Sequence, residues 1–208
     1  MNLPSCVKEF SNRRGRRYNG TMVDTAHSNK EPSPWVTRFA PLAPKLLPVL
    51  DVACGDGRHT RFFRHRGLRV TATDIDLSGI MDLEADDGVE LINRDLEDGS
   101  HWAFGTQTFG TVVVTNYLHR PLLPPMVATI AHGGILIYET FALGNEAHGG
   151  PSNHNHLLKA GELIDAVRGK LQIVAYEHGR IEVPAPAVVQ RICAINGGLP
   201  YPVMPKDD

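Results

Sequence analysis

A loop of small residues follows an apolar segment that carries an acid, and this combination lets a chain bring its backbone close to a ligand. The acid is Asp51, and the loop contains Ala53, Cys54, Gly55 and Gly57. Small side chains avoid collision with a ligand, and glycine permits the positive φ that a tight turn needs. The pattern predicts a strand, a binding loop and a helix whose N-terminal N–H groups face the ligand.

A second acid, Asp74, ends the next apolar segment. It follows Gly57 at close to the ~20-residue spacing of acids that bind ribose hydroxyls. The loop lacks the G-x-G-x-x-G pattern of dinucleotide sites, because Ala53 occupies the first glycine position. Asp51, Asp74 and Asp95 are each also compatible with ordinary caps of turns. Their order together with the loop favours a bound adenosyl cofactor.

Polar and aromatic side chains follow a later apolar segment, over residues 116–121. His119 is the candidate general base, since an unperturbed histidine titrates near neutrality. Asn116 and Tyr117 are candidates to orient a substrate or to line its site. The alternative for His119 is a cap of the following helix or a hydrogen bond to a carbonyl, and Arg120 is equally compatible with a structural ion pair.

The loop from Asp51 to Gly57 resembles motif I of class I S-adenosylmethionine-dependent methyltransferases. From Pro34 onward the chain is similar to small bacterial methyltransferases of the tellurite-resistance and thiopurine type. Three further segments carry this similarity: residues 33–36, 116–121 and 139–141. The resemblance implies methyl transfer from S-adenosylmethionine, with S-adenosylhomocysteine as the product.

The resemblance also implies a role for individual residues. Asp51 would support the methionine amino group, Asp74 the ribose, and the small loop residues would pass the sulfonium centre. Ile75 would lie against the adenine, and Asp95 and Leu96 would contact its exocyclic amine. The implied cofactor-binding residues are Arg38, Asp51, Ala53, Cys54, Gly55, Gly57, Asp74, Ile75, Asp95, Leu96 and Asn116. The implied catalytic residues are His119, Asn116 and Tyr117.

A helix before the first strand is expected to cover the cofactor. Trp35, Val36 and Phe39 recur at helical spacing, with Ser33 as a candidate N-cap. On this helix Arg38 is a candidate partner for the methionine carboxylate. The alternative is a surface helix with one buried tryptophan.

Apolar patterning places these residues in an alternation of strands and helices. We expect strands at 49–53, 68–73, 89–93, 109–115 and 135–139, and helices at 35–47, 57–66, 122–131 and 160–167. Short strands joined by helices indicate a parallel sheet with right-handed crossovers. Residues 171–178 and 188–195 indicate an antiparallel hairpin at the sheet edge. The predicted fold is α/β, a Rossmann-like seven-stranded methyltransferase sheet with helices on both faces.

The first residues differ in composition from the rest. Residues 1–34 contain Arg13, Arg14, Arg16 and Arg17 without an apolar period, so we expect a flexible basic arm before a single domain at 35–208. No run of about 18 apolar residues and no signal peptide is evident, which predicts a cytoplasmic protein without a membrane partner. Three cysteines without a C-x-x-C pair disfavour a disulfide framework or a zinc ribbon.

A long polar segment, residues 144–156, follows the fifth predicted strand. His148, His154 and His156 lie in it, but no aspartate or cysteine completes a ligand set, so no metal is predicted. A substrate lid or a solvated loop is the preferred interpretation.

Three functions remain open at this point. The first is an enzyme that methylates a small molecule. The second is an RNA or protein methyltransferase whose N-terminal arginines bind phosphates. Against it, the arginines are few and lack interleaved aromatic residues beyond Tyr18. The third is a non-catalytic partner subunit that binds S-adenosylmethionine.

Overall fold

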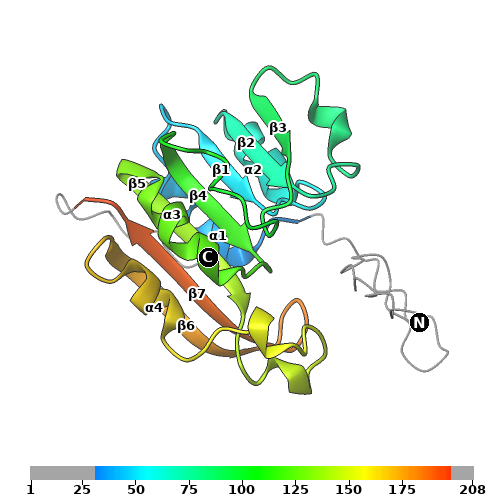
Figure 1. Cartoon of the computed structure of the whole chain (residues 1–208), viewed down its shortest axis with the longest axis vertical. Coiled ribbons are helices and arrows are strands. Elements are labelled where there is room, and N and C mark those ends of the chain that lie inside the picture. The colour runs from blue at the N-terminus through cyan, green and yellow to red at the C-terminus, as the bar shows by residue number, and fades with distance from the viewer. Residues whose placement is uncertain (1–30, 198–208) are drawn as a thin grey trace, which may run out of the picture. The chain divides into compact units, whose positions relative to one another are not determined.

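The computed structural model describes residues 31–197, which form one sheet with helices packed on it (Figure 1). The strands are β1 (Val49–Val52), β2 (Val70–Asp74), β3 (Val89–Asn93), β4 (Phe109–Thr115), β5 (Ile130–Phe141), β6 (Gln172–Ile181) and β7 (Ala187–Ile195). The α-helices are α1 (Pro34–Phe39), α2 (Arg58–His65), α3 (Leu123–Ala128) and α4 (Glu162–Val167). Short 3₁₀ turns are η1 (Ala40–Leu42), η2 (Met81–Leu83), η3 (Arg120–Leu122), η4 (Asn145–Ala147) and η5 (His154–His156).

The seven strands lie in the order β3-β2-β1-β4-β5-β7-β6. Strands β1 to β5 pair in parallel, and β7 pairs antiparallel with both β5 and β6. The predicted seven-stranded sheet with a C-terminal antiparallel hairpin is therefore confirmed. The order reverses at β1, which puts the loop after β1 at the crevice where ligands bind in open α/β sheets.

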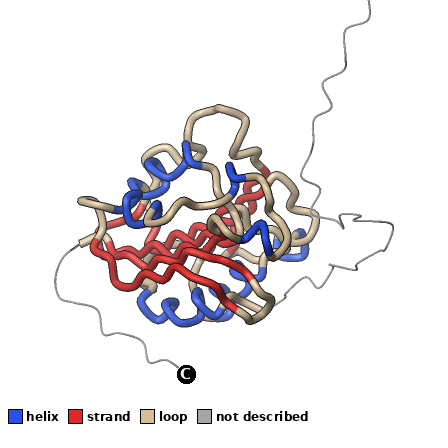
Figure 2. Tube along the Cα trace, turned by 90° about the horizontal axis from the view of Figure 1, so that it is seen from below, coloured by secondary structure: helices blue, strands red, loops and turns tan. Residues whose placement is uncertain are grey.

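Helices cover both faces of the sheet, as Figure 2 shows. On one face α1 and α2 pack on Val49 and Val113, and on the other α3 and α4 pack on residues such as Leu50 and Val112. This division follows from the alternation of side chains along a strand. Because the side chains of Asp51 and Val49 lie on the same face of β1, the Asp51 carboxyl faces α2.

The first helix is shorter than its predicted range of 35–47. Ser33 caps it as expected, its Oγ accepting a hydrogen bond from the Trp35 N–H at 3.1 Å. Pro41 then lies in the 3₁₀ turn η1, and the chain becomes extended at Ala43. Proline removes an intrahelical hydrogen bond, which explains the early end.

Strand β5 is longer than predicted and includes the glycines expected to precede it. A Cβ at Gly134 would lie 2.8 Å from the carbonyl oxygens of Ala131 and Gly110, so the strands approach there because the side chain is absent. Gly133 also donates its N–H to the Asn196 carbonyl at 2.6 Å. Pairing with β4 and with Asn196, directly after β7, thus brings both glycines into the strand. Helix α3 accordingly ends at Ala128 rather than at residue 131.

The predicted arm falls largely on residues 1–30, which lie outside the described residues, as do residues 198–208. Within residues 31–197, no helix has the length and apolar character needed to cross a membrane.

Candidate functional site

The loop after β1 turns through alternate left-handed residues. Ala53, Gly55 and Gly57 have φ values of 52°, 56° and 73°. The Cys54 N–H donates to the Thr73 carbonyl at 3.0 Å, which ties the loop to the end of β2. A left-handed φ is costly for alanine, and residues held in such conformations cluster at ligand sites. The loop has the sharp course that the sequence predicted.

Asp74 joins this loop to the second predicted binding element. The residue is 8% exposed, and its Oδ2 accepts a hydrogen bond from the Gly55 N–H at 2.8 Å. Its Oδ1 accepts from the Asp76 N–H at 3.2 Å. The structure therefore brings the glycine loop and the predicted ribose acid into direct contact at the carboxyl ends of β1 and β2.

Asp51 lies beneath the loop with only 2% of its surface exposed. Its Oδ2 accepts a hydrogen bond from Thr60 Oγ1 at 2.7 Å. Helix α2 has no side-chain cap at Gly57, so this contact fixes its first turn. Burial raises the pKa of the Asp51 carboxyl to about 6, although Thr60 and the positive charge of Arg58 favour ionisation. A buried carboxylate with this pKa is suited to an ammonium partner.

The predicted adenine contacts lie along the neighbouring strand ends. Ile75, directly after Asp74, is an apolar side chain that is 55% exposed. Asp95 follows β3, and its Oδ1 accepts from the Glu97 N–H at 2.8 Å. Leu96 packs against the α3 face of the core. An exposed isoleucine beside a buried acid provides an apolar surface at the position that the resemblance assigns to adenine.

The predicted acceptor residues follow β4 and meet a residue that the sequence analysis missed. Asn116 is exposed with a φ of 55°. His119 Nδ1 lies 3.7 Å from Glu97 Oε2. Burial first, and then the negative charge of Glu97, raises the pKa of Tyr117. Glu97 therefore faces both side chains, and its position directly after Asp95 and Leu96 was the only sequence signal for it.

A polar network links the start of α1 to helix α2 and to the end of β5. Ser33 donates its Oγ–H to Glu139 Oε1 at 2.8 Å, and its N–H to His59 Nε2 at 3.1 Å. Arg191 pairs with Glu139 at 2.6 Å. Burial and the nearby Arg58 lower the pKa of His59 to about 3, so the ring is neutral and its Nε2 can accept. The signal for Glu139 was a charged residue at the end of an apolar strand.

The two arginines near this network have different surroundings. Arg38 lies 3.3 Å from Glu177 Oε1 of β6, and its guanidinium is 5.0 Å from the centre of the Phe39 ring. Arg58, the first residue of α2, donates from Nη2 to Thr115 Oγ1 at 3.4 Å. The structure thus brings Arg58 to the end of β4 beside β1, and it does not bring Arg38 together with the glycine loop.

Arg120 acts as a structural ion-pair partner, the alternative left open for it. Its Nε lies 2.6 Å from Glu162 Oε1, and its Nη2 lies 3.0 Å from Glu162 Oε2. It also donates to the carbonyls of Asn155 and Leu157, at 2.6 Å and 2.8 Å. These contacts, here called the Arg120 clamp, fix the end of the loop after β5 against the segment after β4.

The loop after β5 contains His148, His154 and His156, which are not grouped as metal ligands. His154 Nε2 lies 3.9 Å from Glu146 Oε1. In the part of the chain that the structure describes, no group of three histidine, cysteine or acidic side chains is arranged to hold a metal ion.

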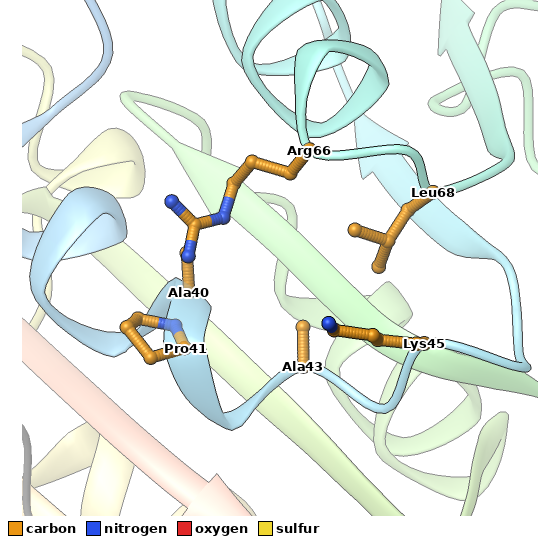
Figure 3. Close-up of a pocket in the computed structure, with 6 residues that line it drawn as sticks. All are labelled: Ala40, Pro41, Ala43, Lys45, Arg66 and Leu68. Carbon is orange, nitrogen blue, oxygen red and sulfur yellow. The ribbon is translucent and has the colours of Figure 1, made fainter.

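A depression lies at the amino-terminal ends of the strands, where Lys45 precedes β1 and Leu68 precedes β2 (Figure 3). Its volume is about 230 Å³, less than the roughly 300 Å³ at which ligand pockets begin. Arg66 extends toward Ala40 across it. It is remote from the carboxyl ends of the strands and contributes nothing to the candidate site.

Residues 49–132 match a family profile described as "Methyltransferase domain". This region contains the glycine loop, Asp74, Asp95 and the segment after β4. A search of curated proteins gave no match.

Solved structures share the fold. TehB from Haemophilus influenzae is 15% identical, with a TM-score of 0.61 over 78% of this chain and 61% of that chain. This chain therefore spans less than two thirds of that protein's length. A 1,6-didemethyltoxoflavin-N1-methyltransferase from Burkholderia thailandensis, solved with 1,6-didemethyltoxoflavin and S-adenosylhomocysteine, is 20% identical, with a TM-score of 0.58 over 79% of this chain and 76% of that chain. A TehB-like protein from Corynebacterium glutamicum is 15% identical, with a TM-score of 0.55 over 78% and 86% of the two chains.

Proposed function

We propose that this chain, which has the class I methyltransferase fold and a methyltransferase-domain match over residues 49–132, transfers a methyl group from S-adenosylmethionine to a small-molecule acceptor. The observation that carries the proposal is the hydrogen bond from the Gly55 N–H to Asp74 Oδ2. It unites the loop and the acid at the reversal point of the strand order, where a nucleoside can contact both.

The adenosine end of the cofactor fits the residues at the ends of β2 and β3. A carboxylate offers about four lone-pair sites. The N–H groups of Gly55 and Asp76 use two of those on Asp74, so sites remain for ribose hydroxyls. Ile75 would pack against the adenine, with Asp95 and Leu96 near its edge.

The amino-acid end fits the residues around the glycine loop. Asp51 would bind the methionine ammonium, whose charge compensates for the buried carboxylate. The small residues Ala53, Cys54 and Gly55 would let the backbone pass close to the sulfur. The bound cofactor supplies an electrophilic methyl group.

The segment after β4 would serve the acceptor. Methyl transfer requires an acceptor held in line and a dry site, with a base where the acceptor loses a proton. His119 would take that proton on Nε2, while the Glu97 carboxylate, 3.7 Å from Nδ1, orients the ring. Asn116 and Tyr117 would line the acceptor site.

A small molecule is the preferred acceptor. The Burkholderia thailandensis structure holds 1,6-didemethyltoxoflavin, the compound that its enzyme name gives as the methyl acceptor, in this fold. The residues at the acceptor side comprise a few polar and aromatic groups, as small-molecule sites do. The arginines at positions 13, 14, 16 and 17, which would favour RNA, lie outside the described residues.

Labelled methyl transfer tests this proposal. The purified chain is incubated with methyl-labelled S-adenosylmethionine and with separated small-molecule, RNA and protein fractions from cells. We expect label in the small-molecule fraction, with His119→Ala lowering the rate while affinity for S-adenosylhomocysteine is retained. Label confined to RNA or protein would refute the acceptor class. Binding of S-adenosylhomocysteine without transfer to any fraction would refute the enzymatic role.

A further inference from the structure

The sequence named Arg38 as a candidate partner for the methionine carboxylate, but in the structure this side chain pairs with an acid outside the glycine loop. Its partner Glu177 lies on β6, at the edge of the sheet. Four strand spacings separate β6 from β1, a distance of about 19 Å. Arg38 also lies over the rings of Trp35 and Phe39. These contacts hold its guanidinium on α1, above the antiparallel hairpin.

Arg58 has the location that Arg38 lacks. It follows Gly57 directly, so its backbone belongs to the glycine loop and the start of α2. Its Nη2 donates to Thr115 Oγ1 at 3.4 Å, which places the guanidinium beside the end of β4, the strand that pairs with β1. The side chain therefore lies across the carboxyl ends of the two central strands, next to the loop.

The donors of Arg58 are largely unused. A guanidinium has five N–H donors in a planar fork that matches a carboxylate. Among residues 31–197, the bond to Thr115 is the single hydrogen bond of the Arg58 side chain, and no acid lies within 4.0 Å of its guanidinium. By contrast Arg61, one turn along the same helix, forms two short bonds to Asp82, at 2.6 Å and 2.7 Å. Arg58 is thus a half-buried cation without a close counter-ion.

Arg58 and the nearby carboxylate of Asp51 carry opposite charges, as a binding site for a zwitterionic ligand requires. Burial is the main cause that lowers its pKa, and the carboxylates of Asp51 and Glu139 offset this in part. Both carboxylates form their short contacts with other groups, Asp51 with Thr60 and Glu139 with Ser33 and Arg191, so neither forms an ion pair with Arg58. A ligand that carries an ammonium and a carboxylate on one carbon can satisfy Asp51 and Arg58 together.

We propose that Arg58, rather than Arg38, binds the carboxylate at the amino-acid end of S-adenosylmethionine, while Asp51 binds the ammonium. This assignment rests on the proposed function. It adds a determinant of ligand choice, since the pair selects ligands with an intact amino-acid end over adenosine thioethers that lack one.

Calorimetry with two ligands tests the assignment. S-adenosylhomocysteine carries the amino-acid end, and 5′-methylthioadenosine keeps the adenosine and the thioether without it. We expect Arg58→Met to weaken S-adenosylhomocysteine binding about 10- to 100-fold, the range for charge-assisted hydrogen bonds, and to leave methylthioadenosine binding unchanged. Arg58→Lys keeps the charge without the fork, so its loss should be intermediate.

Arg61→Met is the matched control, because it removes an arginine of the same helix whose partner is the surface residue Asp82. It should bind both ligands as the wild type does. Equal losses for both ligands in Arg58→Met would overturn the assignment, as would a selective loss of S-adenosylhomocysteine binding in Arg38→Met instead. A wild-type chain that binds methylthioadenosine but shows no preference for S-adenosylhomocysteine would overturn the carboxylate site alone. Failure to bind either ligand would overturn the proposed function as well.

Discussion

Replacing Asp51 with asparagine should raise the stability of the protein while lowering its affinity for the cofactor. Asp51 is 2% exposed, and burial raises the pKa of its carboxyl from 3.8 to about 6. Above that pH the folded protein holds a desolvated carboxylate that the unfolded chain would solvate freely. Asparagine keeps an oxygen to accept the Thr60 hydrogen bond, and it carries no charge.

The sign and the size of the stability change follow from the two pKa values. Below about pH 4 the carboxyl is protonated in both states, so its ionisation contributes nothing. Between about pH 4 and 6 the folded chain retains the proton longer, so the free energy of unfolding of the wild type falls as pH rises. The loss levels off above the folded pKa at about 3 kcal/mol, which corresponds to a pKa raised from 3.8 to about 6. Asp51→Asn is free of this loss.

Urea unfolding of both proteins across this pH range is the assay. We expect the advantage of Asp51→Asn to grow with pH and to reach up to about 3 kcal/mol near neutrality. Asp82→Asn is a control of opposite sign, because Arg61 lowers the pKa of this surface carboxyl and its removal should reduce stability as pH rises. In calorimetry Asp51→Asn should bind S-adenosylhomocysteine more weakly. An Asp51→Asn protein less stable than the wild type near neutrality, or a difference independent of pH, would refute the reasoning.

Three other substitutions probe the ribose acid, the core and the loop. Asp74→Ala should weaken S-adenosylhomocysteine binding about 10- to 100-fold by removing charge-assisted hydrogen bonds, and unchanged affinity in calorimetry would contradict its role. Gly134→Ala places a Cβ 2.8 Å from two carbonyl oxygens, and should lower the free energy of unfolding by about 1–3 kcal/mol in urea. Arg120→Met should speed amide exchange in residues 153–158 and leave β1 unchanged; equal exchange in both proteins would show that the ion pair does not order the loop.

Local sequence patterns were sufficient to predict the sheet and the cofactor loop. The strands at 89–93 and 109–115 coincide with β3 and β4, because each is a short apolar run bounded by turn residues. The glycine loop was predictable since its turn depends on the conformational freedom of Gly55 and Gly57 within one short segment. The limits of β5 were not, because its extension over Gly133 depends on pairing with Asn196.

The polar contacts of the site could not be predicted from the sequence, because they depend on the tertiary structure. Ser33 and Glu139 are 106 residues apart in the chain, and no local pattern relates them. The choice between Arg38 and Arg58 depends on Glu177, which pairs with Arg38 from the far edge of the sheet. Glu97 meets His119 because the loops after β3 and β4 converge, although these strands are not neighbours in the sheet.

The Arg120 clamp ties the end of the loop after β5 to the segment after β4 that carries the candidate acceptor residues. Arg120 is adjacent in the chain to His119, and its guanidinium holds the carbonyls of Asn155 and Leu157. An acceptor that pushes the loop outward would therefore shift the backbone that carries the candidate base. We expect these contacts of Arg120 to limit the size of the acceptor. A larger molecule that enters the site would displace His119, the candidate base, and would therefore not be methylated efficiently.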